Sequence, residues 1–347
     1  MTVLVKSPGF YSTIQDRGRR GLRHLGIPWA GVGCEPWMRF ANALLMQNLT
    51  TPVIELIEGG LSLFASSQPI RFALVGDVTA TITQASGLTQ TAHSWRSHTL
   101  NTGDTLSVNT TGKFKCAVLG IYGMDIKPHF GSASTYPNAS LGGLSGAALA
   151  ADDEIPILRQ TADKPHLSLP PFRFPGEAES HASFEVRAVL GPQDDYFSDE
   201  TLAHFFENEY QISQDIDRMG ARLTGPILTH KSTDHRDLVS DAVLPGSVQV
   251  PGSGQPIVML ADAHTMGGYP KIATVVSADL SLFALYRPNQ TLRFINVDNE
   301  AALAHTRAVE TSVQNHLEKL TPITGEDLSS ERLLGLNLVS GVADALH

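Results

Sequence analysis

Residues 245–276 read PGSVQVPGSGQPIVMLADAHTMGGYPKIATVV, and this stretch decides how the second half of the chain is interpreted. The apolar runs IVMLA (257–261) and IATVV (272–276) have the length and composition of buried β-strands. Between them, DAHTMGGYPK (262–271) places an acid, a histidine, two glycines, a tyrosine and a lysine. The pattern predicts a polar loop that two buried strands hold rigidly, which is a favourable place for a binding site.

Short runs of the same kind recur through the rest of the chain, and glycine or polar turn residues separate them. They are VIELI (53–57), LSLFA (61–65), IRFALVG (70–76), VTATIT (78–83), TLSVN (105–109) and KCAVLGIYG (115–123). Closely spaced short strands are typical of sandwiches and barrels. Helical spacing of apolar residues predicts helices over 35–48, over 199–211 behind an N-cap at Ser198, and from residue 300. The predicted fold class is mainly β with a few helices.

Changes in pattern along the chain predict four segments. A β-barrel-like domain over 1–157 precedes a proline-rich connector over 158–183, which shows no sustained periodicity. A second β domain covers 184–299, and a helical tail covers 300–347. The tail ends in a leucine-rich stretch that we expect to pack on its own domain, with docking on a partner as the alternative. Its leucines are Leu333, Leu334, Leu336 and Leu338.

The composition narrows the class of protein. A net charge of -10 over 347 residues argues against nucleic-acid binding, which normally requires a basic surface. No run approaches the roughly 18 apolar residues of a membrane span, and the first residues lack the pattern of a secretory signal. The two cysteines are too few for a disulfide framework. We therefore expect a cytoplasmic protein that binds neither membranes nor nucleic acid.

Common nucleotide and metal motifs are missing from the sequence. There is no G-x-x-x-x-G-K-[ST] run, so a P-loop nucleotide site is not expected in this chain. There is also no C-x-x-C pair and no H-E-x-x-H, which removes the usual zinc patterns. No metal site is predicted.

Three stretches combine glycine with hydrogen-bonding side chains inside apolar surroundings: 7–21, 212–225 and 238–276. In each, glycine permits a close approach of the backbone, while Gln, Asp, Arg or Lys supplies hydrogen bonds. Each residue taken singly has a structural explanation; Asp217 and Arg218, for example, could be an ion pair that fastens a turn. Their density in three short stretches favours a site.

Four motifs resemble one known family. They are SPGFYSTIQDRGRRGLRHLGIP (7–28), GPQDDYF (191–197), DRMGARLTG (217–225) and the opening stretch. Together they resemble the biotin-dependent carboxyltransferase family, over about residues 3–298. The family includes the C subunit of ATP-dependent 5-oxoprolinase, KipA-type regulators and the carboxyltransferase part of urea carboxylase. The resemblance implies cyclophilin-like β-barrel domains.

The resemblance also implies a function. The first expectation is the C subunit of an ATP-dependent 5-oxoprolinase, which hydrolyses 5-oxo-L-proline to L-glutamate together with two partner proteins, one KipI-like and one LamB/YcsF-like. ATP would then be a cofactor at the level of the complex. Two alternatives stay open: a biotin-dependent carboxyltransferase acting on urea or a related amide, and a KipA-like regulatory protein that binds a KipI-like inhibitor. A separate chain of this length favours the first of these three functions, the C subunit of a 5-oxoprolinase.

Residue chemistry, combined with the resemblance, gives four candidate catalytic residues. Arg218 and Lys271 could bind the carboxylate or phosphate of a small anionic substrate. Asp217 and Asp262 could orient a donor or act as a base. We expect the Arg218 turn and the Lys271 turn to meet in one cleft.

The candidate substrate-binding residues surround the same loops. Lactam opening develops negative charge on an oxygen atom, and backbone N–H groups at a glycine pair could stabilise it. His264 is a further candidate acid–base group because its ordinary pKa lies near 6.5. The predicted substrate-binding set is Gln15, Gln249, Gln255, Thr265, Gly267, Gly268 and Tyr269.

Overall fold

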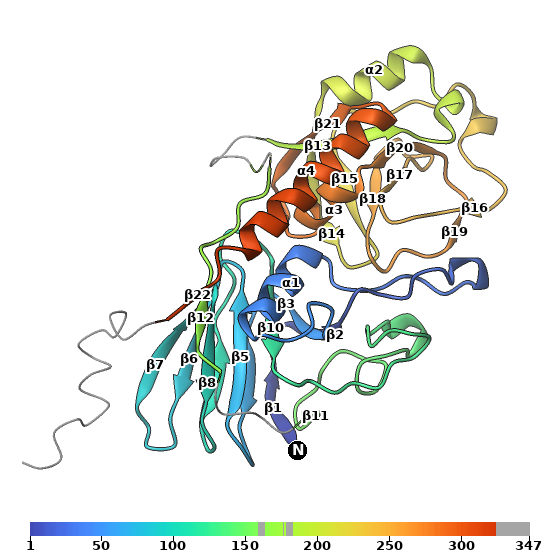
Figure 1. Cartoon of the computed structure of the whole chain (residues 1–347). Coiled ribbons are helices and arrows are strands. Elements are labelled where there is room, and N and C mark those ends of the chain that lie inside the picture. The colour runs from blue at the N-terminus through green and yellow to red at the C-terminus, as the bar shows by residue number, and fades with distance from the viewer. Residues whose placement is uncertain (159–163, 176, 178–182, 324–347) are drawn as a thin grey trace, which may run out of the picture.

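Two sheets make up the N-terminal half of the computed structural model, which describes residues 1–158, 164–175, 177 and 183–323 (Figure 1). The first sheet has the order β11 (Glu154–Pro156), β1 (Thr2–Pro8), β4 (Leu61–Phe64), β9 (Thr105–Val108), β6 (Thr79–Thr83) and β7 (Thr89–His93). The second has the order β2 (Tyr11–Gln15), β3 (Val53–Ile57), β10 (Cys116–Ile121), β5 (Ile70–Val75), β8 (Arg96–Leu100), β12 (Leu167–Ser168) and β22 (Thr321–Pro322). Apolar residues of both sheets belong to one core cluster, so the sheets pack face to face.

Strands β5 and β10 are buried at every position because both of their faces are covered. Phe72 and Leu74 of β5 face the first sheet, whereas Ala73 and Val75 join the cluster that contains α1 (Glu35–Leu44). The helix approaches β10 closely at Gly120, where a Cβ atom would lie 3.0 Å from Leu45 and 3.3 Å from Ala41. The apolar residues that recur at helical spacing in this segment therefore form the contact of the helix with the sheet.

The C-terminal half contains a closed barrel of seven strands (Figure 1). Around the barrel the order is β13 (Phe184–Leu190), β20 (Lys271–Val275), β17 (Ser247–Gln249), β18 (Ile257–Met259), β15 (Gly220–Thr224), β14 (Glu209–Ile216) and β21 (Thr291–Asn296). A separate two-stranded ladder joins β16 (Asp241–Ala242) to β19 (Met266–Gly267) beside it. The predicted class, mainly β with a few helices and a β-barrel, is confirmed.

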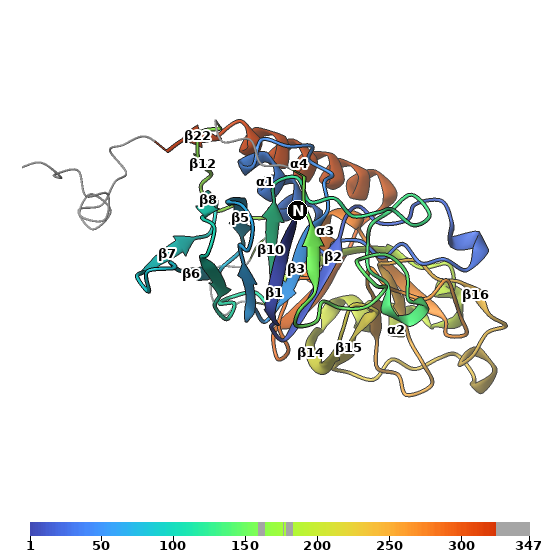
Figure 2. The ribbon, with the colours of Figure 1, turned by 90° about the horizontal axis from the view of Figure 1, so that it is seen from below.

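Two helices connect the halves. α3 (Ser277–Phe283) follows β20, and α4 (Asn299–Leu317) contacts both α3 and α1. Figure 2 shows α4 lying across the two halves, with α1 and α3 beside it. After α4, β22 pairs with β12, so the chain returns to the N-terminal sheet. The core cluster that contains α1 also includes barrel residues such as Phe294, which makes the hydrophobic core continuous across the junction.

The structure corrects one predicted helix and adds detail to two segments. α2 (Asp199–Glu207) begins behind Ser198 as expected, but it ends before Tyr210, which lies on β14 and is fully buried. Asn208 is extended, and its side chain donates to the His204 carbonyl at 2.8 Å, which ends the helix. In the proline-rich connector, Phe172 and Phe174 are buried in the core. The four-segment division stays a prediction, and the leucines at 333–338 lie outside the described residues.

His316 on α4 fastens this helix to the N-terminal half. Its ring lies 4.9 Å from Phe40 and 5.0 Å from Phe172, and its Nε2 atom donates to the Pro170 carbonyl at 2.9 Å. Burial lowers the pKa of His316. In the folded protein the imidazole therefore remains neutral at pH values at which the same histidine in the unfolded chain is already protonated.

This pKa shift predicts a pH-dependent stability. The unfolded histidine has a pKa near about 6.5, so the stabilisation is complete above that pH and declines as the pH falls below it. We expect the decrease in Tm between about pH 7.5 and pH 5.5 to be smaller in His316→Phe than in the wild type, as measured by thermal unfolding. The exposed His24→Phe serves as the control, and an unchanged pH slope in His316→Phe would contradict the prediction.

Candidate functional site

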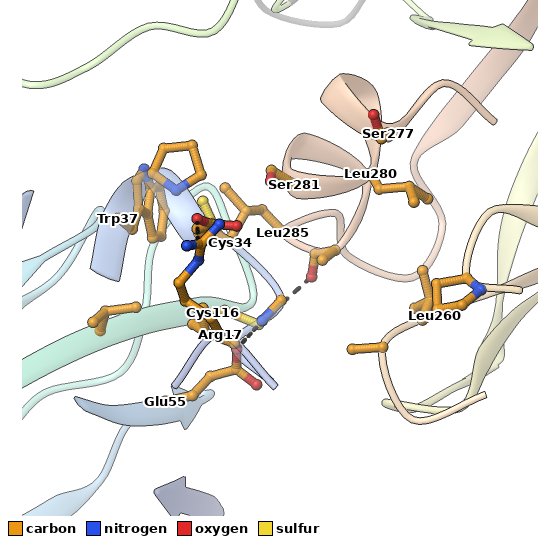
Figure 3. Close-up of a pocket in the computed structure, with 18 of the residues that line it drawn as sticks. Arg17, Cys34, Trp37, Glu55, Cys116, Leu260, Ser277, Leu280, Ser281 and Leu285 are labelled. Carbon is orange, nitrogen blue, oxygen red and sulfur yellow. Dashed lines mark hydrogen bonds and ion pairs between the residues drawn. The ribbon is translucent and has the colours of Figure 1, made fainter. Parts of the chain in front are cut away.

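A cavity of about 360 Å³ lies where the two halves meet, and we call it the junction cavity. Its walls come from α1, β3, β10, α3, α4 and the turn at 217–218. Figure 3 shows Trp37, Cys34, Cys116 and Glu55 on the N-terminal side of the cavity, and Leu260, Ser277, Leu280 and Ser281 on the other side. Because both halves contribute walls, the cavity exists only in the assembled fold.

Arg218 lies in the wall of the junction cavity and binds carboxylates from both halves. Its Nε and Nη2 atoms donate to the two oxygens of Asp262 at 3.0 and 2.8 Å. Nη1 donates to Glu55 on β3, and Nη2 also donates to the Gly31 carbonyl at 2.6 Å. A guanidinium has five N–H donors, so one N–H on Nη1 is left without an acceptor among the described residues.

Burial alone would lower the pKa of Arg218, but the carboxylates of Asp262 and Glu55 raise it above its usual value. The guanidinium therefore stays charged at any pH at which the protein is folded. Two of its four hydrogen bonds cross to the N-terminal half and two hold Asp262, so most of its donors are used within the protein rather than facing a ligand. The structural explanation considered for Arg218 is thus correct in kind, although the partners are Asp262 and Glu55 instead of Asp217.

Gln15 supports this network from behind. Its Oε1 atom accepts from the Gly31 N–H at 3.1 Å, and its Nε2 atom donates to Thr13 and to the Thr135 carbonyl. Gln15 therefore fixes the backbone of Gly31, whose carbonyl accepts from Arg218. The structure places Gln15 in a supporting position, outside both cavities described here.

The two cysteines on the cavity wall are thiols under ordinary conditions. Burial raises the pKa of Cys34 well above its usual value and raises that of Cys116 to about 12. The thiolate is the nucleophilic form of cysteine, so neither side chain is prepared for nucleophilic attack.

A second cavity, of about 430 Å³, lies against the barrel, and we call it the loop cavity. It is lined by residues of the 214–222 turn, by β17 and β18, and by His264 and Tyr269 from the polar loop. Gln249 is 2 % exposed, and its Nε2 atom has no hydrogen-bond partner among the described residues. A Cβ atom on Gly267 would lie 2.7 Å from this nitrogen and 3.2 Å from Nε2 of His264, so a larger residue there would require these side chains to move.

The polar loop is also held by the N-terminal half. Arg23, in the 7–28 motif, donates to the carbonyls of Val243, Ala263 and His264, and the last bond is 2.6 Å long. Burial lowers the pKa of His264, and the nearby Arg23 lowers it further, so the imidazole is neutral near pH 7. A neutral imidazole can either donate or accept a hydrogen bond toward the loop cavity.

Lys271 lies apart from Arg218. Its Nζ atom donates to Asp241 at 2.7 Å, and its backbone N–H donates to Gln193 of the GPQDDYF motif at 3.2 Å. Lys271 lines neither of the two cavities, whereas Arg218 lines the junction cavity. The two cavities described here therefore do not bring the two side chains together as expected: Asp217 lines both cavities, but Lys271 is turned toward Asp241.

The remaining predicted residues are held by backbone contacts. Gln255 exchanges two 3.0 Å hydrogen bonds with the backbone of Gly225, so its amide fastens a loop. Thr265 accepts from the Val243 N–H through its carbonyl, and Gly268 accepts from the Leu238 N–H. None of these three residues lines either cavity.

The sequence analysis missed three residues at the junction: Glu55, Gly31 and Lys115. Glu55 did carry a signal, because an acid inside the apolar run VIELI requires a buried partner. Its partner, Arg218, lies 163 residues away in the sequence, so the pairing was not predictable from local pattern.

The described ranges contain no group of three or more His, Cys, Asp or Glu side chains arranged to hold a metal ion. In the same residues, no helix has the length and apolarity needed to cross a bilayer.

Comparison with known proteins finds relatives by sequence and by structure, and urea amidolyases occur in both sets. The chain is 33% identical to the 5-oxoprolinase C subunit of Escherichia coli over 85% of its own length and 91% of the relative's length. It is 31% identical to the Haemophilus influenzae protein of the same name, covering 84% and 90% of the two chains. It is also 25% identical to the urea amidolyase of Lachancea kluyveri, over 91% of this chain and 18% of that one.

Solved structures share the fold. The crystal structure of TTHA0988 matches with a TM-score of 0.72 at 27% identity, covering 85% of this chain and 55% of that one. The urea carboxylase of Kluyveromyces lactis matches with a TM-score of 0.79 at 22% identity, covering 94% and 30%. This chain thus spans about half of the first protein and less than a third of the second. The family model for the carboxyltransferase domain, subdomain A and B, matches residues 25–296, and the chain belongs to this family.

Proposed function

We propose that this chain is the C subunit of an ATP-dependent 5-oxoprolinase, the complex that opens the lactam of 5-oxo-L-proline to give L-glutamate. The observation that carries the proposal is its similarity to two relatives that bear this name, which extends over 91% and 90% of their lengths. The similarity therefore concerns these relatives nearly from end to end.

The proposal assigns ATP to the complex rather than to this chain. The sequence has no P-loop, and the junction cavity has mostly apolar walls, which suit a small organic molecule better than a triphosphate. The nucleotide would then be bound by a KipI-like partner and a LamB/YcsF-like partner, and turnover would require both of them. Two unpaired, buried cysteines are consistent with a cytoplasmic location.

The junction cavity is the proposed substrate site. Asp217 is exposed and lines both cavities, so it is the acid that is best placed to act as a base. Asp262 is committed to Arg218 and would act by positioning that side chain. Lys271, Gly267 and Gly268 line neither cavity, so anion binding by Lys271 and oxyanion stabilisation by the glycine pair would require the substrate to reach the polar loop, and Lys271 would first have to leave Asp241.

Two other functions are alternatives. A biotin-dependent carboxyltransferase acting on urea or a related amide has support from urea amidolyase relatives, but at 24–25% identity over less than a fifth of their length. A KipA-like regulatory protein would bind a KipI-like inhibitor without turnover. A role for biotin belongs only to the first of these alternatives.

The test is an assay of the assembled complex. We expect the chain, co-expressed with its KipI-like and LamB/YcsF-like partners, to release glutamate from 5-oxo-L-proline only when ATP is present. Avidin-sensitive carboxylation of urea would instead support the carboxyltransferase. A stable complex with the KipI-like partner that consumes no 5-oxoproline would support the regulatory function.

A further inference from the structure

Lys115 is a buried cation on the wall of the junction cavity that the proposed function has not used. It directly precedes β10 and is 6 % exposed. Its backbone is fixed at both ends, because its N–H donates to the Leu285 carbonyl at 2.9 Å and its carbonyl accepts from the Glu58 N–H at 2.8 Å. Among the residues that the structure describes, its Nζ atom has neither a hydrogen bond nor an ion pair. An unpaired buried ammonium is unfavourable unless something else binds it.

Most other cations of the cavity wall are neutralised by carboxylates. Arg17 pairs with Glu35 at 3.0 Å, and Arg39 pairs with Glu310 at 2.8 Å. Arg218 pairs with Glu55, which is also the wall carboxylate whose charge acts most on Lys115. Glu55 is therefore already engaged, whereas Asp217, the other carboxylate that acts on Lys115, accepts from the backbone N–H groups of Met219 and Gly220 and has no ion pair among the described residues.

Among the described residues of the cavity wall, Arg20 is the other cation without a carboxylate partner. It stacks on Trp29, with 4.2 Å between the guanidinium carbon and the ring centroid, and its Nε atom donates to the Arg17 carbonyl at 3.3 Å. Both Arg20 and Lys115 line the cavity. The cavity thus offers positive charge at Lys115 and at Arg20 within walls that are otherwise largely apolar.

We propose that Lys115 is the anion-binding residue of the junction cavity and forms an ion pair with the carboxylate of a small organic acid. The apolar wall residues Val118, Leu280 and Leu285 suit the carbon skeleton of such a ligand. A volume of about 360 Å³ is large enough for a small organic acid and lies at the lower end of ordinary ligand sites. Burial lowers the pKa of Lys115, and a carboxylate bound beside it would raise that pKa again by stabilising the ammonium form.

The choice of 5-oxo-L-proline as the acid rests on the proposed function, whereas the anion site at Lys115 does not. The probes for calorimetry on the full chain are 5-oxo-L-proline, its uncharged amide 5-oxoprolinamide, acetate and inorganic phosphate. We expect the wild type to bind 5-oxo-L-proline at least about tenfold more tightly than the amide, because the amide leaves the buried cation unpaired. Equal affinity for the acid and the amide, or tighter binding of phosphate than of either carboxylate, overturns the proposal.

Three variants separate a binding role from a structural one. Lys115→Met is expected to lose at least about tenfold in affinity for the acid while its ligand-free Tm stays the same or rises, because a buried unpaired charge has been removed. Lys115→Arg should retain part of the affinity, and Lys6→Met, on strand β1, should behave like the wild type. A Lys115→Met protein with a lower Tm and unchanged affinity shows a structural lysine and overturns the proposal.

The outcome also distinguishes this inference from the proposed function. A complex containing Lys115→Met that hydrolyses 5-oxo-L-proline with an unchanged KM overturns the role of Lys115 but leaves the 5-oxoprolinase intact. Lys115-dependent binding of acetate in a protein whose complex releases no glutamate supports the anion site and rejects the 5-oxoprolinase.

Discussion

Arg218→Met is expected to lower the free energy of unfolding by about 3–5 kcal/mol, because it leaves two buried carboxylates without their cation. Glu55 and Asp262 are each at most 5 % exposed at the side chain and come from opposite sides of the junction. Arg218 also donates to the Gly31 carbonyl, which loses its partner. Chemical denaturation of the full chain, followed by tryptophan fluorescence and circular dichroism, measures the change.

A matched control is Arg293→Met. Arg293 forms a 3.5 Å ion pair with Glu185, but both side chains are about half exposed, so its loss should lower stability by less than about 1 kcal/mol. Adding Asp262→Asn to Arg218→Met should recover part of the lost stability, since one unpaired charge is removed. If Arg218→Met and Arg293→Met have equal effects, Arg218 does not hold the junction.

Gly191→Ala is the second change with a large expected effect, a loss of about 3 kcal/mol. A Cβ atom at Gly191 would lie 2.0 Å from the carbonyl oxygen of Lys271 and 2.8 Å from the Ala273 nitrogen, both of which are backbone atoms of β20. Backbone obstacles cannot rotate away, so β13 and β20 must separate, which is at the upper end of overpacking effects. The Gly191 N–H would also lose its 2.9 Å bond to the Ile272 carbonyl.

The same change should disturb Lys271. Gln193, two residues after Gly191, binds both the Lys271 N–H and Asp241, so movement of this turn weakens the Lys271–Asp241 pair. Hydrogen exchange at residues 271–275 should increase in Gly191→Ala. Gly252→Ala is the control, because its nearest neighbour is a flexible Arg236 side-chain atom at 3.7 Å and its stability should be nearly unchanged. A Gly191→Ala protein as stable as this control would contradict the packing argument.

Predictions from the sequence were most accurate where a structural feature depends on residues that are close together in the chain. Short apolar runs located β5 and β10, and helical spacing located α1 and α4, because each pattern arises from neighbours within the same element. The last residues of the predicted 199–211 helix were wrong because Tyr210 is needed in the barrel core, and packing outweighed local propensity. α3 was missed since only seven residues form it.

Local sequence patterns were sufficient to predict the β-rich architecture, the family and the loops that carry polar groups. The use of these groups follows from folding, which joins Arg218 to Glu55 and Asp262, turns Lys271 toward Asp241 and leaves Lys115 unpaired in the described part of the chain. The physical reason is that burial makes a charge dependent on its partner, and these partners come from segments brought together only by folding. A sequence pattern records which residues can ionise, whereas the cavity walls determine which charges are already neutralised.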